Sequence, residues 1–90
     1  MRVHWSSDGW EDYLYWQKAD VQMVRKINEL IGEIRRTPFT GIGRPEPLRG
    51  ELSGWWSRRI NSEHRIVYRV EGKGTDQYMT ILMCRHHYKL

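Results

Sequence analysis

The first forty residues place their hydrophobic side chains at the three- and four-residue intervals of amphipathic helices. Ahead of the helices, the short stretch "RVHWS" at residues 2–6 predicts a strand. Asp8 is followed three residues later by Glu11, which is the capping-box pattern that begins a helix. We expect this first helix to direct one stripe of side chains toward the core, formed by Trp10, Tyr13, Leu14 and Gln17.

A second helix is predicted to begin at Asp20, whose short side chain can cap it. It should end near Thr37, because the residue before a proline avoids the helical region. Two helices with so short a connection pack as an antiparallel pair. The apolar stripe expected in the second helix comprises Val24, Ile27, Ile31 and Ile34.

From Leu48 onward the period of the pattern changes to two. The segments "GWWSRRI", "HRIVYRV" and "YMTILMCRHHY" alternate apolar and polar residues, which is typical of antiparallel strands with one solvated face. Asn61-Ser62-Glu63 predicts a hairpin turn, and residues 71–77 predict a longer one. The sequence therefore predicts one α+β domain over residues 1–90, with two N-terminal helices on one face of a small twisted antiparallel β-sheet.

The alternation also assigns side chains to faces. In the strand that begins at Arg65, the apolar alternate positions face the core, so Arg65 is expected on the open side. If the last strand continues to His87, then His87 and His86 point to opposite faces. At most one of these two histidines can then serve a given site.

The amino-acid composition indicates which class of binding partner to expect. The 90 residues carry a formal net charge of +4, which favours binding to a polyanion. Between residues 44 and 69 every basic residue except His64 is an arginine, and a guanidinium matches phosphate oxygens in a bidentate way. The single cysteine, Cys84, excludes an internal disulfide, and no stretch approaches the roughly 20 apolar residues of a membrane span. We expect a cytoplasmic protein that does not enter a membrane.

The polar residues on the open side permit RNA cleavage without a metal. Such a reaction needs a base for the 2′-OH, an acid for the departing 5′ oxygen and a cation for the phosphorane. Glu46 between two prolines, Arg59 with Arg65, and His87 offer these roles. The histidine spacing does not match a zinc site, so we expect no metal and no cofactor. The simpler interpretation is a solvated loop carboxylate with arginines that serve solubility.

Several motifs resemble the Txe/YoeB-type toxins of the RelE/ParE superfamily of bacterial toxin–antitoxin systems. They include "DYLYWQ" (12–17), "KINELI" (26–31), "PEPL" (45–48) and "CRHHY" (84–88). The resemblance implies a RelE-like fold and an endoribonuclease that cuts messenger RNA in the ribosomal A site. It also implies a Phd/YefM-type antitoxin partner, contact with DNA only through the antitoxin complex, and compatibility with a homodimer.

The resemblance also implies roles for single residues. Glu46 matches the general base, Arg65 the arginine that stabilises the transition state, and His87 the general acid. Arg59 matches a further basic residue of the site and Tyr88 the adjacent C-terminal tyrosine, and we expect both, together with Arg49, to bind the substrate. Two features depart from the family pattern: the "EGKGTDQY" hairpin is longer, and Lys89-Leu90 extend past the usual terminal tyrosine.

Two alternatives compete with the ribonuclease. The first is a toxin of the ParE kind, which binds DNA gyrase and has no nuclease activity. The second is a basic nucleic-acid-binding module, although Glu46, Glu51 and Glu63 interrupt any continuous basic stripe. The "RPEPL" and "HHY" elements favour the ribonuclease, because a pure binder needs neither a braced carboxylate nor a C-terminal acid.

Overall fold

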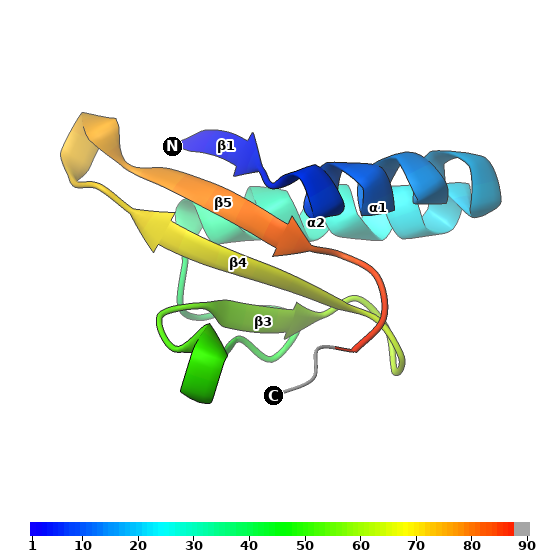
Figure 1. Cartoon of the computed structure of the whole chain (residues 1–90). Helices are drawn as coiled ribbons and strands as arrows, with labels where there is room; N and C mark the ends of the chain where they lie inside the picture. The colour runs from blue at the N-terminus through cyan, green and yellow to red at the C-terminus, as the bar shows by residue number, and fades with distance from the viewer. Residues whose placement is uncertain (88–90) are drawn as a thin grey trace.

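The structure is a computed structural model that describes residues 1–87. Figure 1 shows two helices side by side along one face of a twisted sheet. The elements in chain order are β1 (Arg2–Trp5), α1 (Ser7–Ala19), α2 (Val21–Arg36), β2 (Glu46–Pro47), the short helix η1 (Gly50–Leu52), β3 (Trp56–Arg59), β4 (Arg65–Glu71), the short helix η2 (Gly74–Asp76) and β5 (Tyr78–Met83). The predicted α+β class with two N-terminal helices is confirmed.

The sheet is mixed rather than wholly antiparallel. Its strand order is β1-β5-β4-β3-β2, and β1 runs parallel to β5 while the other neighbours are antiparallel. The helix pair carries the chain from one edge of the sheet to the other, after which the chain returns strand by strand. Periodicity gives the face of each side chain and not the direction of its strand, so the parallel pairing was not predictable from alternation.

The first helix begins two residues earlier than predicted. Its cap is Ser6, whose Oγ accepts from the backbone N–H of Gly9 at 2.9 Å and donates to the carbonyl of Leu82 at 2.7 Å. The predicted cap Asp8 instead lies in the first turn. Ser6 is preferred because its hydroxyl also ties the helix start to β5. The cap of α2 is Asp20, as predicted, and accepts from the N–H of Gln22 at 3.0 Å.

The core lies between the helices and one face of the sheet, called here the helix-covered face. Trp16 is the buried aromatic residue of α1, whereas Trp10 and Leu14 of the predicted stripe are exposed to 45% and 41%. In α2 the buried stripe is rotated slightly, so Val24 and Ile31 pack at the margin of the core. The buried cluster comprises Trp16, Met23, Ile27, Leu30, Ile34, Ile60, Ile66, Tyr68, Met79, Ile81 and Cys84.

One arginine belongs to this buried layer. Arg58 is fully buried, and its Nε donates to the hydroxyl of Tyr68 at 3.1 Å. Its Nη1 donates to the carbonyl of Ile42 at 3.0 Å, and its Nη2 to those of Thr37 at 2.6 Å and Thr40 at 2.9 Å. Arg58 therefore fixes the loop between α2 and β2. The arginine-rich segment 44–69, which suggested phosphate recognition, thus includes one guanidinium whose donors are used within the fold.

Candidate active site

Three of the predicted site residues come from neighbouring strands and share a face. Glu46 of β2 lies opposite Ser57 of β3, and Arg59 of β3 lies opposite Arg65 of β4. Paired residues share a face, and Ser57 and Arg59 are about 7 Å apart along one strand. The alternate positions, such as Ile66, face the helices. Glu46, Arg59 and Arg65 thus lie together on the side away from the helices, called here the open face.

Arg65 is buried, although it was predicted to be open. The residue is only 8% exposed. Its Nη1 donates to three carbonyls of the turn, those of Asn61 at 2.9 Å, His64 at 3.2 Å and Ser62 at 3.4 Å. Its backbone N–H donates to the carbonyl of His86 at 3.0 Å. The hairpin turn and the returning C-terminal segment cover it. The guanidinium is consequently held in place rather than solvated.

Glu46 and Arg59 are exposed, as expected for residues that meet a ligand. The loop before β2 is constrained, because the N–H of Arg59 donates to the carbonyl of Gly43 at 2.7 Å and Arg44 adopts a left-handed φ of 53°. The prolines on both sides of Glu46 limit its backbone further. Arg49, at the start of η1, is also exposed and lies three residues after Glu46.

The last strand ends at Met83, earlier than predicted. A register irregularity between Val67 and Tyr68 of β4 places Met83 opposite Val67, on the open face. The chain then bends at Arg85 and His86, and His86 adopts a left-handed φ of 66°. The prediction that regular alternation separates the two histidines is therefore wrong, because neither belongs to a strand.

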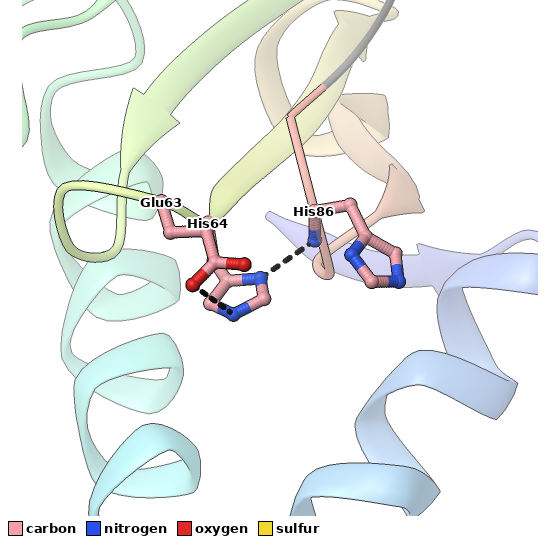
Figure 2. A group of neighbouring side chains, drawn as sticks. All are labelled: Glu63, His64 and His86. Atoms are coloured by element: carbon pink, nitrogen blue, oxygen red, sulfur yellow. Dashed lines mark hydrogen bonds and ion pairs between the residues drawn. The ribbon is translucent and has the colours of Figure 1, made fainter.

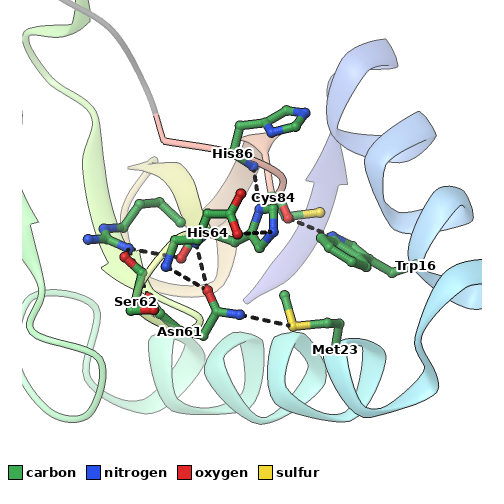
Figure 3. A network of polar contacts seen from close by, with 9 residues as sticks. Trp16, Met23, Asn61, Ser62, His64, Cys84 and His86 are labelled. Atoms are coloured by element: carbon green, nitrogen blue, oxygen red, sulfur yellow. Dashed lines mark hydrogen bonds and ion pairs between the residues drawn. The ribbon is translucent and has the colours of Figure 1, made fainter.

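Hydrogen bonds from two parts of the chain hold this bend (Figure 3). The N–H of Cys84 donates to the carboxylate of Asp12 at 3.0 Å, and Nε1 of Trp16 donates to the carbonyl of Cys84 at 2.9 Å. The N–H of His86 donates to Nδ1 of His64 at 2.7 Å. α1 and the 61–65 turn thus fix the backbone over residues 84–86.

The proposed acid follows directly after this anchored segment. His87 is exposed and is separated by one peptide bond from His86, whose carbonyl accepts from the N–H of Arg65. The structure therefore brings the backbone at His87 beside Arg65. Tyr88, the predicted substrate-binding residue, lies outside the described residues, as do Lys89 and Leu90.

Glu63, His64 and His86 form a cluster that sequence reasoning missed (Figure 2). Each offers a ligand atom within 4.8 Å of the others. A neutral imidazole has one lone-pair nitrogen, and that of His64 already accepts from the N–H of His86. A metal could bind His64 only by breaking this bond, so we assign no metal to the cluster. The adjacent letters "EHR" before a strand were the available signal, but their partner lies far along the chain.

Burial changes the acidity of two groups beside the bend. Desolvation raises the pKa of Asp12, an effect that the N–H of Cys84 partly offsets by stabilising the carboxylate. Burial, with the nearby Asp12 charge, raises the pKa of the Cys84 thiol to about 12. Cys84 is therefore a protonated core residue and not a nucleophile, as predicted.

Two helices packed on one five-stranded mixed sheet form the α+β fold of the small RelE-like toxins of bacterial toxin–antitoxin systems. A family described as YoeB-like toxins of bacterial type II toxin–antitoxin systems matches residues 5–88. The toxin YoeB of Escherichia coli K12 is 57% identical over 88 residues, which cover 98% of this chain and 100% of that toxin. The chain belongs to the YoeB-like toxin family.

Solved structures agree with this assignment. A YoeB/ParE toxin from Agrobacterium tumefaciens superposes with a TM-score of 0.93 at 52% identity, covering 98% of this chain and 100% of that one. The YoeB toxin in a heterotetrameric YoeB–YefM complex from Staphylococcus aureus gives a TM-score of 0.86 at 45% identity, with 98% of both chains covered. The chain is thus a toxin of a type II toxin–antitoxin system. Among residues 1–87, no helix is long and apolar enough to cross a membrane.

Proposed function

We propose that this toxin is a metal-independent endoribonuclease that cleaves messenger RNA on the ribosome in the cytoplasm. The observation that carries the proposal is the joint placement of Glu46, Arg59 and Arg65 on the open face, with the residue before His87 bonded to the backbone of Arg65. A carboxylate, cations and an imidazole are the groups that cleavage through the 2′-OH requires.

In the proposed reaction, Glu46 takes the proton of the ribose 2′-OH and the oxygen attacks the adjacent phosphorus. Arg65 and Arg59 stabilise the negative charge that grows on the phosphoryl oxygens. His87 donates a proton to the 5′ oxygen as the P–O5′ bond breaks. The products are a 2′,3′-cyclic phosphate and a 5′-hydroxyl, so protons and bonds balance. Arg49 and Tyr88 are proposed to contact the RNA.

The proposed protein partner is an acidic Phd/YefM-type antitoxin that covers the open face. A net charge of +4 and the exposed arginines Arg49 and Arg59 favour binding to carboxylates. The related Staphylococcus aureus toxin is found in a complex with YefM, which supports such a partner here. Binding should weaken as salt is added, because part of the attraction is between exposed charges. Contact with DNA would occur only through the antitoxin complex, and a homodimer is proposed as a further assembly.

Cleavage of a message with a single 2′-deoxy ribose at the cut position tests the mechanism. Programmed ribosomes in Mg²⁺ buffer, with a chelator selective for transition metals, should support cutting of the all-ribose message and not of its deoxy counterpart. Glu46→Gln should be inactive on both messages. Cutting of the deoxy message would exclude the 2′-OH as nucleophile. Intact messages, together with inhibited DNA supercoiling by gyrase, would instead identify a toxin of the ParE kind.

A further inference from the structure

His64 is a buried histidine on the hairpin turn, and its contacts go beyond support of the turn itself. The residue is 9% exposed, and its Nδ1 accepts from the backbone N–H of His86 at 2.7 Å across 22 residues of sequence. A backbone amide is always a donor, so Nδ1 must carry the lone pair and Nε2 the proton. The hydrogen bond therefore defines the tautomer of His64.

The surroundings of the ring agree with this tautomer. Nε2 lies 3.7 Å from a carboxylate oxygen of Glu63, which favours a proton on that nitrogen. Trp16 packs edge-on against the ring, with centroids 4.8 Å apart at 81°. The N–H of His64 donates to the side-chain oxygen of Asn61 at 2.7 Å. Trp16 and Glu63 thus contact the ring and Asn61 binds the backbone of the same residue; Figure 3 shows Trp16 and Asn61 beside His64.

The consequence of this arrangement falls on His86. His86 has a φ of 66°, a left-handed conformation that costs energy for any residue with a Cβ. Two consecutive residues hold it there: His64 accepts from its N–H, and the N–H of Arg65 donates to its carbonyl at 3.0 Å. Both backbone polar groups of His86 are therefore bound by the dipeptide His64-Arg65. The direction in which the chain leaves toward His87 depends on these two bonds.

We propose that His64 is a positioning residue, whose unprotonated Nδ1 holds the His86 backbone so that His87 meets the leaving oxygen beside Arg65. The proposal rests on the proposed ribonuclease function. His64 itself transfers no proton and binds no substrate. It links the turn that carries Arg65 to the segment that carries His87, so one buried acceptor aligns the cation with the acid.

Three substitutions of His64 distinguish the effect of losing the hydrogen-bond acceptor from the effect of losing the volume of the ring. His64→Asn places an amide oxygen close to the position of Nδ1, His64→Gln places its amide near Nε2, and His64→Leu has no acceptor. Misplacement of a catalytic group by about 1 Å can cost on the order of 100-fold in rate. We expect His64→Leu and His64→Gln to lower the single-turnover cleavage rate about 10- to 100-fold, with affinity for programmed ribosomes unchanged. His64→Asn should recover most of the wild-type rate.

The outcomes separate this proposal from the ribonuclease proposal. No cleavage by the wild-type toxin would remove the reaction itself. Cleavage by the wild type with equal rates for all three variants, or with His64→Asn as slow as His64→Gln, would overturn the positioning role. If His64→Leu fails to fold, the comparison of His64→Asn with His64→Gln still tests the positioning role.

A spectroscopic measurement tests the hydrogen bond without reference to activity. In the wild-type toxin, ¹⁵N shifts of the His64 ring should report an unprotonated Nδ1 and a protonated Nε2. The chemical shift of the His86 amide proton should be downfield in the wild type and in His64→Asn. In His64→Gln it should lie upfield of its value in both. A protonated Nδ1, or an His86 amide that does not respond to His64→Gln, would contradict the proposal.

Discussion

Arg58 and Arg59 are neighbours in sequence, but they lie on opposite faces of the sheet and differ in every contact. Arg58 is fully buried on the helix-covered face, where it donates to three backbone carbonyls and one hydroxyl. Arg59 is exposed on the open face and pairs with Arg65 across the strands. On one face the guanidinium is satisfied from within and supports the fold. On the other its charge is available to an external anion.

Arg65 shares one feature with Arg58 and one with Arg59. It lies on the open face, yet it is buried and donates to the carbonyls of its own turn through Nη1. A cation held in this way loses little conformational freedom when a phosphate binds, which suits a group that must stabilise a transition state. The comparison predicts that substitutions on the open face affect activity and those on the helix-covered face affect stability.

The largest effect is expected for Glu46 and His87, the proposed base and acid. Glu46→Ala and His87→Ala should each lower the cleavage rate about 10²- to 10⁴-fold. Both residues are exposed, so the free energy of unfolding should change by less than about 0.5 kcal/mol. Cleavage of programmed ribosomes and urea unfolding measure the two quantities. A large loss of stability in either variant would break the division between the faces.

Arg65→Ala should lose as much activity and also some stability, because its removal leaves turn carbonyls without their donor. His86→Ala is the matched control, since it keeps the backbone groups that His64 and Arg65 bind. It should cost far less activity than His87→Ala. Equal losses at the two histidines would contradict the assignment of His87 as the acid.

On the helix-covered face, Arg58→Met should lower the free energy of unfolding by about 3 kcal/mol, because buried carbonyls of the 37–42 loop lose their donors. Arg59→Met is the matched control on the other face and should change it by less than about 0.5 kcal/mol. Urea unfolding followed by tryptophan fluorescence measures both. Similar midpoints for the two variants would show that Arg58 does not hold the loop.

Local patterns predicted most of the elements, because each helix or strand buries one face and repeats with its own period. The errors arose where a contact between distant residues decided between local options. Ser6 and Asp8 are both suitable caps, and only the bond of Ser6 to Leu82 of β5 distinguishes them. Trp16 rather than Trp10 is buried because its indole N–H reaches the carbonyl of Cys84.

For the candidate site, the sequence predicted which face of the sheet its strand residues occupy. Alternation correctly placed Arg59 and Arg65 on one face, and register then added Glu46. The burial of Arg65 and the proposed role of His64 could not be predicted, because both involve hydrogen bonds to the backbone of His86, which is distant in sequence and lies in a bend rather than a strand. Periodicity does not reveal the irregularity in the pairing of β4 and β5 that precedes the end of β5.

A smaller effect is expected from two glycines that differ in the space around them. A Cβ on Gly9 would lie 2.5 Å from the carbonyl oxygen of Ile81, whereas nothing lies within 4 Å of a Cβ on Gly32 in α2. Gly9→Ala should therefore lower the free energy of unfolding by about 1–3 kcal/mol, since α1 must move from β5. Gly32→Ala should raise it by about 0.5–1 kcal/mol through helix propensity. Thermal unfolding of the two variants checks both signs, and stabilisation by both would contradict the close packing of α1 on β5.

The smallest effect concerns Asp12, which lies where the helix-covered face meets the bend. Burial raises the pKa of its carboxyl in the folded state, so the ionised form is less favourable there than in the unfolded chain. Its contribution to stability is therefore complete below the unfolded pKa of about 4 and is lost as pH rises through the raised folded pKa. Asp12→Asn keeps an oxygen that can accept from the N–H of Cys84 and carries no charge. Relative to this variant, the wild-type urea midpoint should fall as pH rises from about 4 to 7. A wild-type midpoint that instead rises relative to Asp12→Asn over this range would mean that the bond to Cys84 outweighs the desolvation of the carboxylate.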